Sequence, residues 1–248
     1  MVLTDKRVFV FFAHPDDAEF GVAATAAKLA RQGNEIWYVI CTGGAGGIHT
    51  LATTPGELLD IREQEQRAAM EMLGVKEAIG LRYLRKPGEW GSPSELVEKI
   101  MRLIRQYRPY IIFTHDPWRP YQIHPAHRMV GWAATEAGYL ADRPWYFPQH
   151  IAEGLEPYKP SEMVLFGTQE PNYWVDVTET IDLKIEALRQ HKTQLGNHVE
   201  PPWLEEFARW VKGWAAEAGK QIGVDYAEAF HRVTDGDWIS DDGTITGL

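Results

Sequence analysis

The sequence predicts an α/β fold, a three-layer sandwich in which a mostly parallel central sheet lies between two layers of helices. Segments rich in Val, Ile and Phe alternate with segments whose apolar residues recur at helical spacing, and this alternation is typical of parallel sheets. The first strand has a continuous apolar run from Val8 to Ala13, which indicates burial on both faces. Histidine and aspartate residues follow two of the strands.

Length and composition favour one large domain that acts on a small molecule. The chain has 248 residues, of which 44% are hydrophobic. We expect residues 1–248 to form a single domain, whose part from about 141 to 248 forms a pocket wall and peripheral helices. The formal charge of −10 argues against partners such as nucleic acid or an anionic membrane, because both need a basic surface.

The cysteine content and the hydropathy pattern favour a cytoplasmic protein. Cys41 is the single cysteine, which excludes an internal disulfide and a multi-cysteine metal site. Because His14-Pro15-Asp16-Asp17 interrupts the apolar run near the N-terminus, we expect no signal peptide. No run approaches the roughly 18 apolar residues that a membrane-spanning helix needs.

Helices and strands are predicted to alternate along the first half of the chain. Two helix starts match the capping-box pattern, in which a hydroxyl side chain and a glutamate satisfy backbone N–H groups: Thr54-Pro55-Gly56-Glu57 and Ser92-Pro93-Ser94-Glu95. The predicted elements are a helix over 18–31, a strand over 35–41, a helix over 54–74, a strand over 79–84, a helix from 92 to Pro109 and a strand over 110–114.

The second half is predicted to contain helices, two short strands and one irregular stretch. A proline-rich stretch over 141–160 is expected to be irregular. The predicted elements are a helix over 125–139, strands over 163–166 and 173–177, a helix that begins at 176–179 and carries Ile181, Ile185 and Leu188, and a helix over 203–218.

Two features of the first half have simple interpretations. The glycine-rich stretch 42–47 lacks the G-x-G-x-x-G pattern of dinucleotide-binding loops, so we interpret it as a rim loop rather than a phosphate cradle. Arg62 and Glu65 lie one helical turn apart, and we interpret them as a solvated ion pair.

The residues that carry chemistry follow two strands. His14, Asp16 and Asp17 follow the first strand, and His124 and His127 follow the strand over 110–114. The carboxyl ends of parallel strands line a common crevice, and the helix N-terminus there favours ionised aspartates. Two imidazoles and a carboxylate can hold a catalytic metal with positions left open, while a second carboxylate takes a proton from water. The spacing does not decide which aspartate binds the metal.

The motifs around these residues resemble those of a known enzyme family. Ala13-His14-Pro15-Asp16-Asp17-Ala18-Glu19 and His124-Pro125-Ala126-His127-Arg128 are similar to the two signature motifs of the PIG-L (LmbE-like) zinc-dependent de-N-acetylases. The resemblance implies a Rossmann-like fold and hydrolytic removal of an N-acetyl group from an N-acetylated amino sugar or glycoconjugate. It also implies a homo-oligomer, a trimer or a hexamer.

The resemblance implies a role for each site residue. It assigns Zn²⁺ as the cofactor and implies the following set: metal ligands His14, Asp17 and His127, general base Asp16, oxyanion stabiliser His124 and substrate contact Arg62. The chain departs from the family at Ala126, where an aspartate is usual. Without that acid we expect His124 to be less readily protonated, unless Asp116 substitutes for it.

Two other function classes stay open. A non-haem iron oxygenase also uses two histidines and one carboxylate, and a non-catalytic zinc-binding module would need only the ligands. The parallel α/β pattern and the additional Asp16 favour the hydrolase. The aromatic residues in or near rim loops that could stack on a sugar are Trp90, Trp118, Tyr121, Trp145 and Tyr146.

Overall fold

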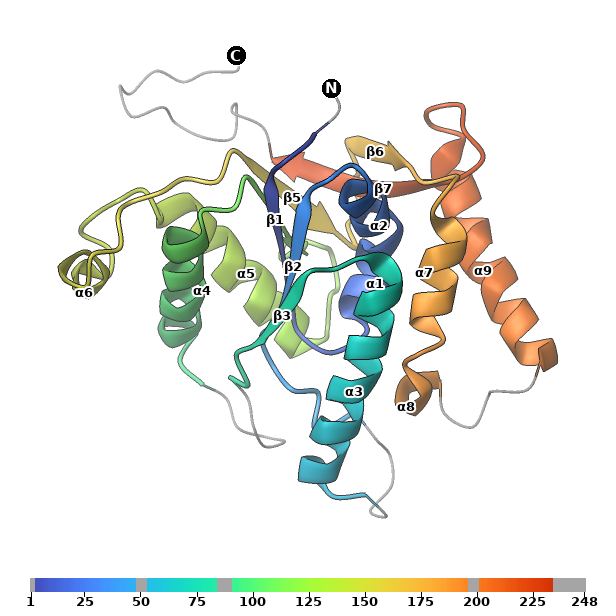
Figure 1. Ribbon diagram of the computed structural model, residues 1–248, viewed down its shortest axis with the longest axis horizontal. Coiled ribbons are helices and arrows are strands. Elements are labelled where there is room, and N and C mark those ends of the chain that lie inside the picture. The colour runs from blue at the N-terminus through green and yellow to red at the C-terminus, as the bar shows by residue number, and fades with distance from the viewer. Residues whose placement is uncertain (1–2, 48–52, 84–90, 196–200, 234–248) are drawn as a thin grey trace.

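The computed structural model describes residues 3–47, 53–83, 91–195 and 201–233, and it has the predicted three-layer arrangement (Figure 1). One seven-stranded sheet has the order β3-β2-β1-β4-β5-β7-β6. Five strands are mutually parallel: β1 (Arg7–Phe12), β2 (Glu35–Ile40), β3 (Glu77–Gly80), β4 (Ile111–His115) and β5 (Glu162–Phe166). β7 (Ala227–Val233) runs antiparallel between β5 and β6 (Tyr173–Asp176). The mostly parallel sheet is therefore confirmed.

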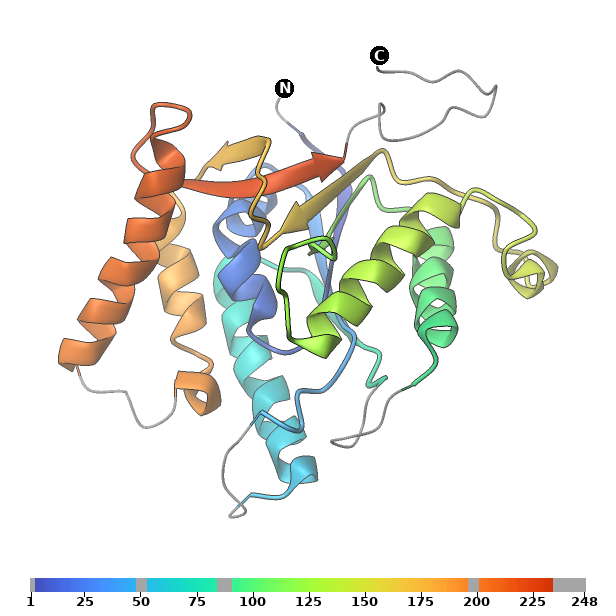
Figure 2. The same cartoon turned by 180° about the vertical axis from the view of Figure 1, so that it is seen from behind.

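Helices cover both faces of this sheet, as Figure 1 and the reverse view in Figure 2 show. One face carries α4 (Pro93–Tyr107) and α5 (Pro125–Leu140). The other face carries α1 (Asp17–Gly21), α2 (Ala23–Arg31), α3 (Pro55–Leu73) and α7 (Ile181–Leu188), with α9 (Pro201–Gly219) packed on α7. Two short helices, α6 (Pro148–Ala152) and α8 (Lys192–Leu195), complete the described helices.

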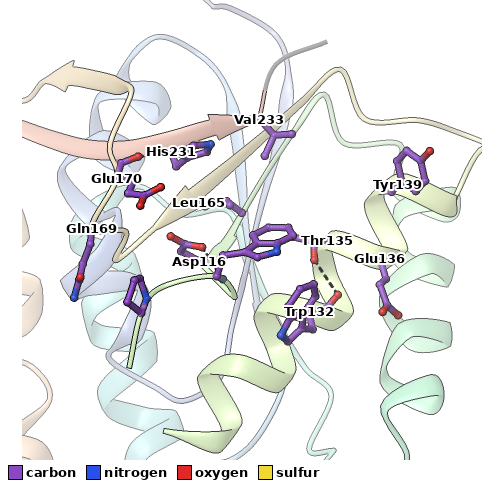
Figure 3. A pocket seen from close by; sticks show the side chains of 12 residues that line it. Asp116, Trp132, Thr135, Glu136, Tyr139, Leu165, Gln169, Glu170, His231 and Val233 are labelled. Carbon is purple, nitrogen blue, oxygen red and sulfur yellow. Dashed lines mark hydrogen bonds between the residues drawn. The ribbon is translucent and has the colours of Figure 1, made fainter. Parts of the chain in front are cut away.

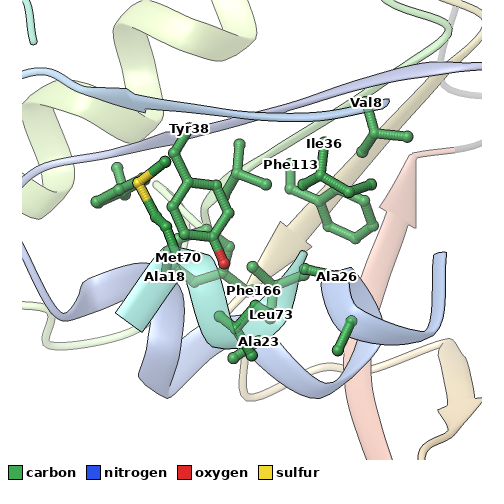
Figure 4. Packing of buried hydrophobic residues seen from close by; sticks show 14 of the residues in the cluster. Val8, Ala18, Ala23, Ala26, Ile36, Tyr38, Met70, Leu73, Phe113 and Phe166 are labelled. Atoms are coloured by element: carbon green, nitrogen blue, oxygen red, sulfur yellow. The ribbon is translucent and has the colours of Figure 1, made fainter. Parts of the chain in front are cut away.

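The central strand β1 is buried on both faces, as its apolar run predicts. Val8, Val10 and Phe12 pack in the cluster beneath α2 and α3, which Figure 4 shows around Tyr38. Phe9 and Phe11 belong to the cluster beneath α4 and α5. The alternation follows from the period of two along a strand. Because β1 lies between β2 and β4, its carboxyl end is flanked by strands on both sides.

The single helix predicted over 18–31 is wrong, because the chain breaks at Val22 into α1 and α2. Two buried side chains from the C-terminal half satisfy backbone groups at this break. Glu228 of β7 accepts a hydrogen bond from the N–H of Thr25 at 2.8 Å, and Lys184 of α7 donates to the carbonyl of Phe20 at 2.8 Å. Lys184 Nζ also lies 2.7 Å from Glu228 Oε1, so one ion pair spans the break.

Several predicted boundaries also change. The capping box at Thr54 is confirmed, whereas the side chain of Ser92 makes no capping hydrogen bond. α7 begins at Ile181 rather than at 176–179, and α6 lies within the stretch expected to be irregular. β3 lies over 77–80 rather than 79–84, and Leu84 is outside the described residues. Among the described residues, no helix combines the length and the apolarity needed to cross a membrane.

Candidate metal centre

The ends of β1 and β4 bring the predicted metal ligands together. β1 and β4 are parallel neighbours, so the residues that follow them lie at one edge of the sheet. His14 Nδ1 lies 3.3 Å from Asp17 Oδ2, and His127 Nε2 lies 3.2 Å from Asp17 Oδ1. The ligand nitrogens of His14 and His127 are within 4.8 Å of each other. The predicted ligands thus lie together at this edge, and they belong to two donor groups that share His127: His14 with His124 and His127, and Asp17 with His115 and His127.

The spacing of these donors fits a tetrahedral divalent metal such as zinc. Two ligands bound at 2.0–2.1 Å in tetrahedral geometry are about 3.3 Å apart. The observed separations of 3.2 and 3.3 Å match that spacing. The donor set of two imidazoles and one carboxylate suits a divalent transition metal.

Two further histidines lie at the same place. His124 forms one possible donor group with His14 and His127, and its ring stacks on His127 with centroids 4.2 Å apart. His115, the last residue of β4, forms the other group with Asp17 and His127, and its Nε2 lies 3.3 Å from Asp17 Oδ2. Sequence reasoning did not single out His115, although its place at the end of a buried strand beside β1 was a usable signal.

The imidazoles around Asp17 keep its carboxylate ionised. Burial alone would raise the pKa of Asp17, but contacts with His115, His127 and His14 hold that pKa well below its usual range. The backbone N–H of His14 also donates to Asp17 Oδ2 at 2.7 Å. Asp17 therefore has the charge and the fixed position that a metal ligand needs.

Asp16 has a different environment from its neighbour. Burial and the adjacent charge of Asp17 raise the pKa of Asp16 to about 8, which differs from the expectation that the helix N-terminus keeps it ionised. Its backbone is left-handed, with φ of 101°, and its side chain makes no capping hydrogen bond to α1. A divalent cation beside Asp17 would bring positive charge to this pair and lower the pKa of Asp16.

Arg62 is buried rather than solvated, so the expected surface pair with Glu65 is wrong. Its side chain is 2% exposed and lies 3.6 Å from Asp16 Oδ2. The guanidinium donates to the carbonyl oxygens of Pro15 and Gly44. A Cβ atom at Gly44 would lie 2.4 Å from Arg62 Nη1, so the glycine-rich stretch is explained by its close approach to Arg62.

The environment of His124 disfavours its protonated form. Burial and the neighbouring His127 and His14 lower the pKa of His124 to about 4, in line with the expectation drawn from Ala126. Asp116 accepts a hydrogen bond from the N–H of Trp118 at 2.9 Å and lines a separate cavity.

This cavity has a volume of about 620 Å³ and lies between α5 and strands β5 and β7 (Figure 3). Its wall includes Trp118, whose ring meets that of Trp132 edge to face with centroids 4.8 Å apart. Of the aromatic residues expected in rim loops, Trp118 lines this cavity, which lies beside the end of β4. Tyr121 and Trp145 are 96% and 86% exposed, and Trp90 is outside the described residues.

Comparisons with known proteins identify the family. The family model described as GlcNAc-PI de-N-acetylase (PIG-L) matches residues 9–138. The chain is 32% identical to diacetylchitobiose deacetylase from Thermococcus kodakarensis over 92% of this chain and 83% of the relative. It is 29% identical to a probable N-acetyl-α-D-glucosaminyl L-malate deacetylase of Bacillus anthracis, over 84% and 95% of the two chains.

A solved structure gives the same result. N,N′-diacetylchitobiose deacetylase from Pyrococcus horikoshii, in complex with its inhibitor MPG, superposes with a TM-score of 0.83 and 33% identity, covering 92% of this chain and 84% of that one. The identity to the Thermococcus enzyme extends over nearly the whole chain. The protein therefore belongs to the PIG-L family of de-N-acetylases.

Proposed function

We propose that this protein is a zinc-dependent hydrolase that removes the N-acetyl group from a small N-acetylated amino sugar or its conjugate. The observation that carries the proposal is the convergence of His14, Asp17 and His127, with Asp16 next in sequence, in a chain similar to named deacetylases of amino sugars. The same relatives give no support to an oxygenase or to a non-catalytic zinc module.

His14, Asp17 and His127 would hold the zinc ion. When bound, zinc lowers the pKa of water and polarises a carbonyl oxygen. Asp16, as the carboxylate, takes a proton from the attacking water as its oxygen bonds to the acetyl carbon. The C–N bond then breaks, Asp16 returns the proton to the leaving nitrogen, and acetate and a free amine are produced.

His124 would stabilise the negative charge that develops on the acetyl oxygen. It belongs to the donor group with His14 and His127, its ring stacks on His127, and as a neutral imidazole it can donate one N–H. Arg62 is proposed to contact the substrate, as the family resemblance implies. Its guanidinium also lies beside Asp16, which supports a second role in orienting that carboxylate.

Acetate release from a panel of N-acetylated sugars tests this proposal. The panel contains N-acetylglucosamine, N,N′-diacetylchitobiose and N-acetylglucosaminyl malate, each incubated with the zinc-loaded protein and with the Asp16→Asn variant. We expect stoichiometric acetate and amine from at least one compound with the wild type alone. Equal release by the Asp16→Asn variant, or release from no compound, would contradict the proposed function.

We further propose that residues 1–248 act as a single domain in the cytoplasm and assemble as a homo-oligomer. The lone Cys41, buried and unpaired, supports a reducing compartment. Exposed aromatic side chains on α9 support assembly, since Trp210 and Trp214 are 44% and 61% exposed. Size-exclusion chromatography with light scattering distinguishes a trimer or hexamer from a monomer.

A further inference from the structure

Residues other than the proposed metal ligands hold the backbone of Asp16 in place. Side chains of one helix, α3, contact both the C=O and the N–H of the peptide bond between Pro15 and Asp16. Arg62 donates to the carbonyl oxygen of Pro15, and the side-chain oxygen of Gln66, one turn later, accepts from the N–H of Asp16 at 3.3 Å. These two contacts constrain the torsion angles on either side of that peptide bond.

Gln66 is itself held in one orientation. Its amide nitrogen donates to Glu19 Oε1 at 2.8 Å, so its carbonyl oxygen must point toward Asp16. Glu19 Oε2 lies 3.2 Å from the ring of His191, which follows α7. Gln66, Glu19 and His191 are all 1% exposed or less.

We propose that Gln66 is a positioning residue for Asp16, with Glu19 fixing the orientation of its amide. This inference rests on the proposed function, in which Asp16 is the general base. A left-handed backbone is unfavourable for an aspartate, and such conformations persist where surrounding contacts enforce them. Without the Gln66 contact the N–H of Asp16 loses its acceptor, and the carboxylate is free to leave the position in which it takes a proton from water.

The test is a double-mutant cycle in the zinc-loaded enzyme. Gln66→Met keeps the length of the side chain and removes the acceptor, and Gln64→Met, on the exposed side of the same helix, is the matched control. We expect Gln66→Met to lower kcat about ten- to a hundredfold with KM within about twofold. In the Asp16→Asn background the same substitution should lower the residual rate less than about twofold, because Gln66 acts through Asp16.

Two readouts do not depend on activity. Hydrogen exchange of the peptide that contains Asp16 should become faster in Gln66→Met and stay unchanged in Gln64→Met. Zinc content per chain should be equal in the wild type and in both variants. Glu19→Leu removes the acceptor that orients the Gln66 amide, so this variant should also have a lowered kcat.

Each outcome is decisive. Wild-type turnover in Gln66→Met, equal losses in both Asp16 backgrounds, or loss of zinc in Gln66→Met would each overturn the positioning role. Undiminished turnover in Asp16→Asn would instead refute the proposed base, and the positioning role with it. A loss of kcat confined to backgrounds with an intact Asp16, with zinc retained, supports it.

Discussion

The buried ion pair between Lys184 and Glu228 is predicted to hold the break between α1 and α2, and with it the helix that carries Asp17. Lys184 Nζ lies 2.7 Å from Glu228 Oε1, and the two side chains are 10% and 5% exposed. Lys184→Met leaves the carboxylate buried without its counter-ion and the carbonyl of Phe20 without its donor. Removing one partner of such a pair costs about 3–5 kcal/mol of unfolding free energy.

Urea unfolding followed by tryptophan fluorescence measures this loss. Glu228→Met should cost a similar amount, and the double variant should cost less than the sum of the two, with a coupling energy of about 1–3 kcal/mol. Lys99→Met is the control, since Lys99 pairs with Glu95 on the surface and its loss should cost less than about 1 kcal/mol. A loss below about 1 kcal/mol for Lys184→Met, or strict additivity in the double variant, would refute the reasoning.

Three further predictions concern the site and its surroundings. Asp16→Asn should lower kcat at least about a hundredfold while zinc content, measured by mass spectrometry, stays at the wild-type value; loss of zinc would mean that Asp16 is a ligand. His124→Ala should lower kcat about 10²- to 10³-fold. Because the pKa of His124 is lowered to about 4, the imidazole is neutral above that pH, so the ratio of wild-type to variant rates should be constant from about pH 6 to 9; a ratio that falls through this range would show that the protonated form acts. Cys41 is fully buried and its thiol pKa is raised by burial, so a thiol reagent should label it after denaturation but not in the folded protein; rapid labelling of the folded chain would contradict its burial.

The sequence was sufficient to predict the edge of the sheet where the site lies. Buried parallel strands have continuous apolar runs, and polar residues directly after them must lie at one edge. This rule placed His14 and Asp17 near His127, and in the structure both histidines lie within 3.3 Å of the Asp17 carboxylate. The choice of Asp17 over Asp16 as the ligand could not be made by spacing, since both follow the same strand.

What the sequence did not predict depends on contacts between distant segments. β7 was not predicted, and without Glu228 there was no reason to expect a break at Val22. The burial of Arg62 is set by the glycine stretch that lies over it, which helical spacing to Glu65 does not reveal. Gln66 is joined to Glu19 across 47 residues of sequence, and no local pattern distinguishes it from the exposed glutamine two positions earlier.

The zinc affinity of single alanine variants tests the central claim most directly. If His14, Asp17 and His127 are the ligands, each of their alanine variants loses zinc under conditions in which the wild type binds one ion per chain. His124→Ala and His115→Ala should still bind one ion, the latter with affinity lowered by no more than about 10- to 100-fold. Zinc retained in any of the first three variants, or lost equally in His124→Ala, would contradict the assignment.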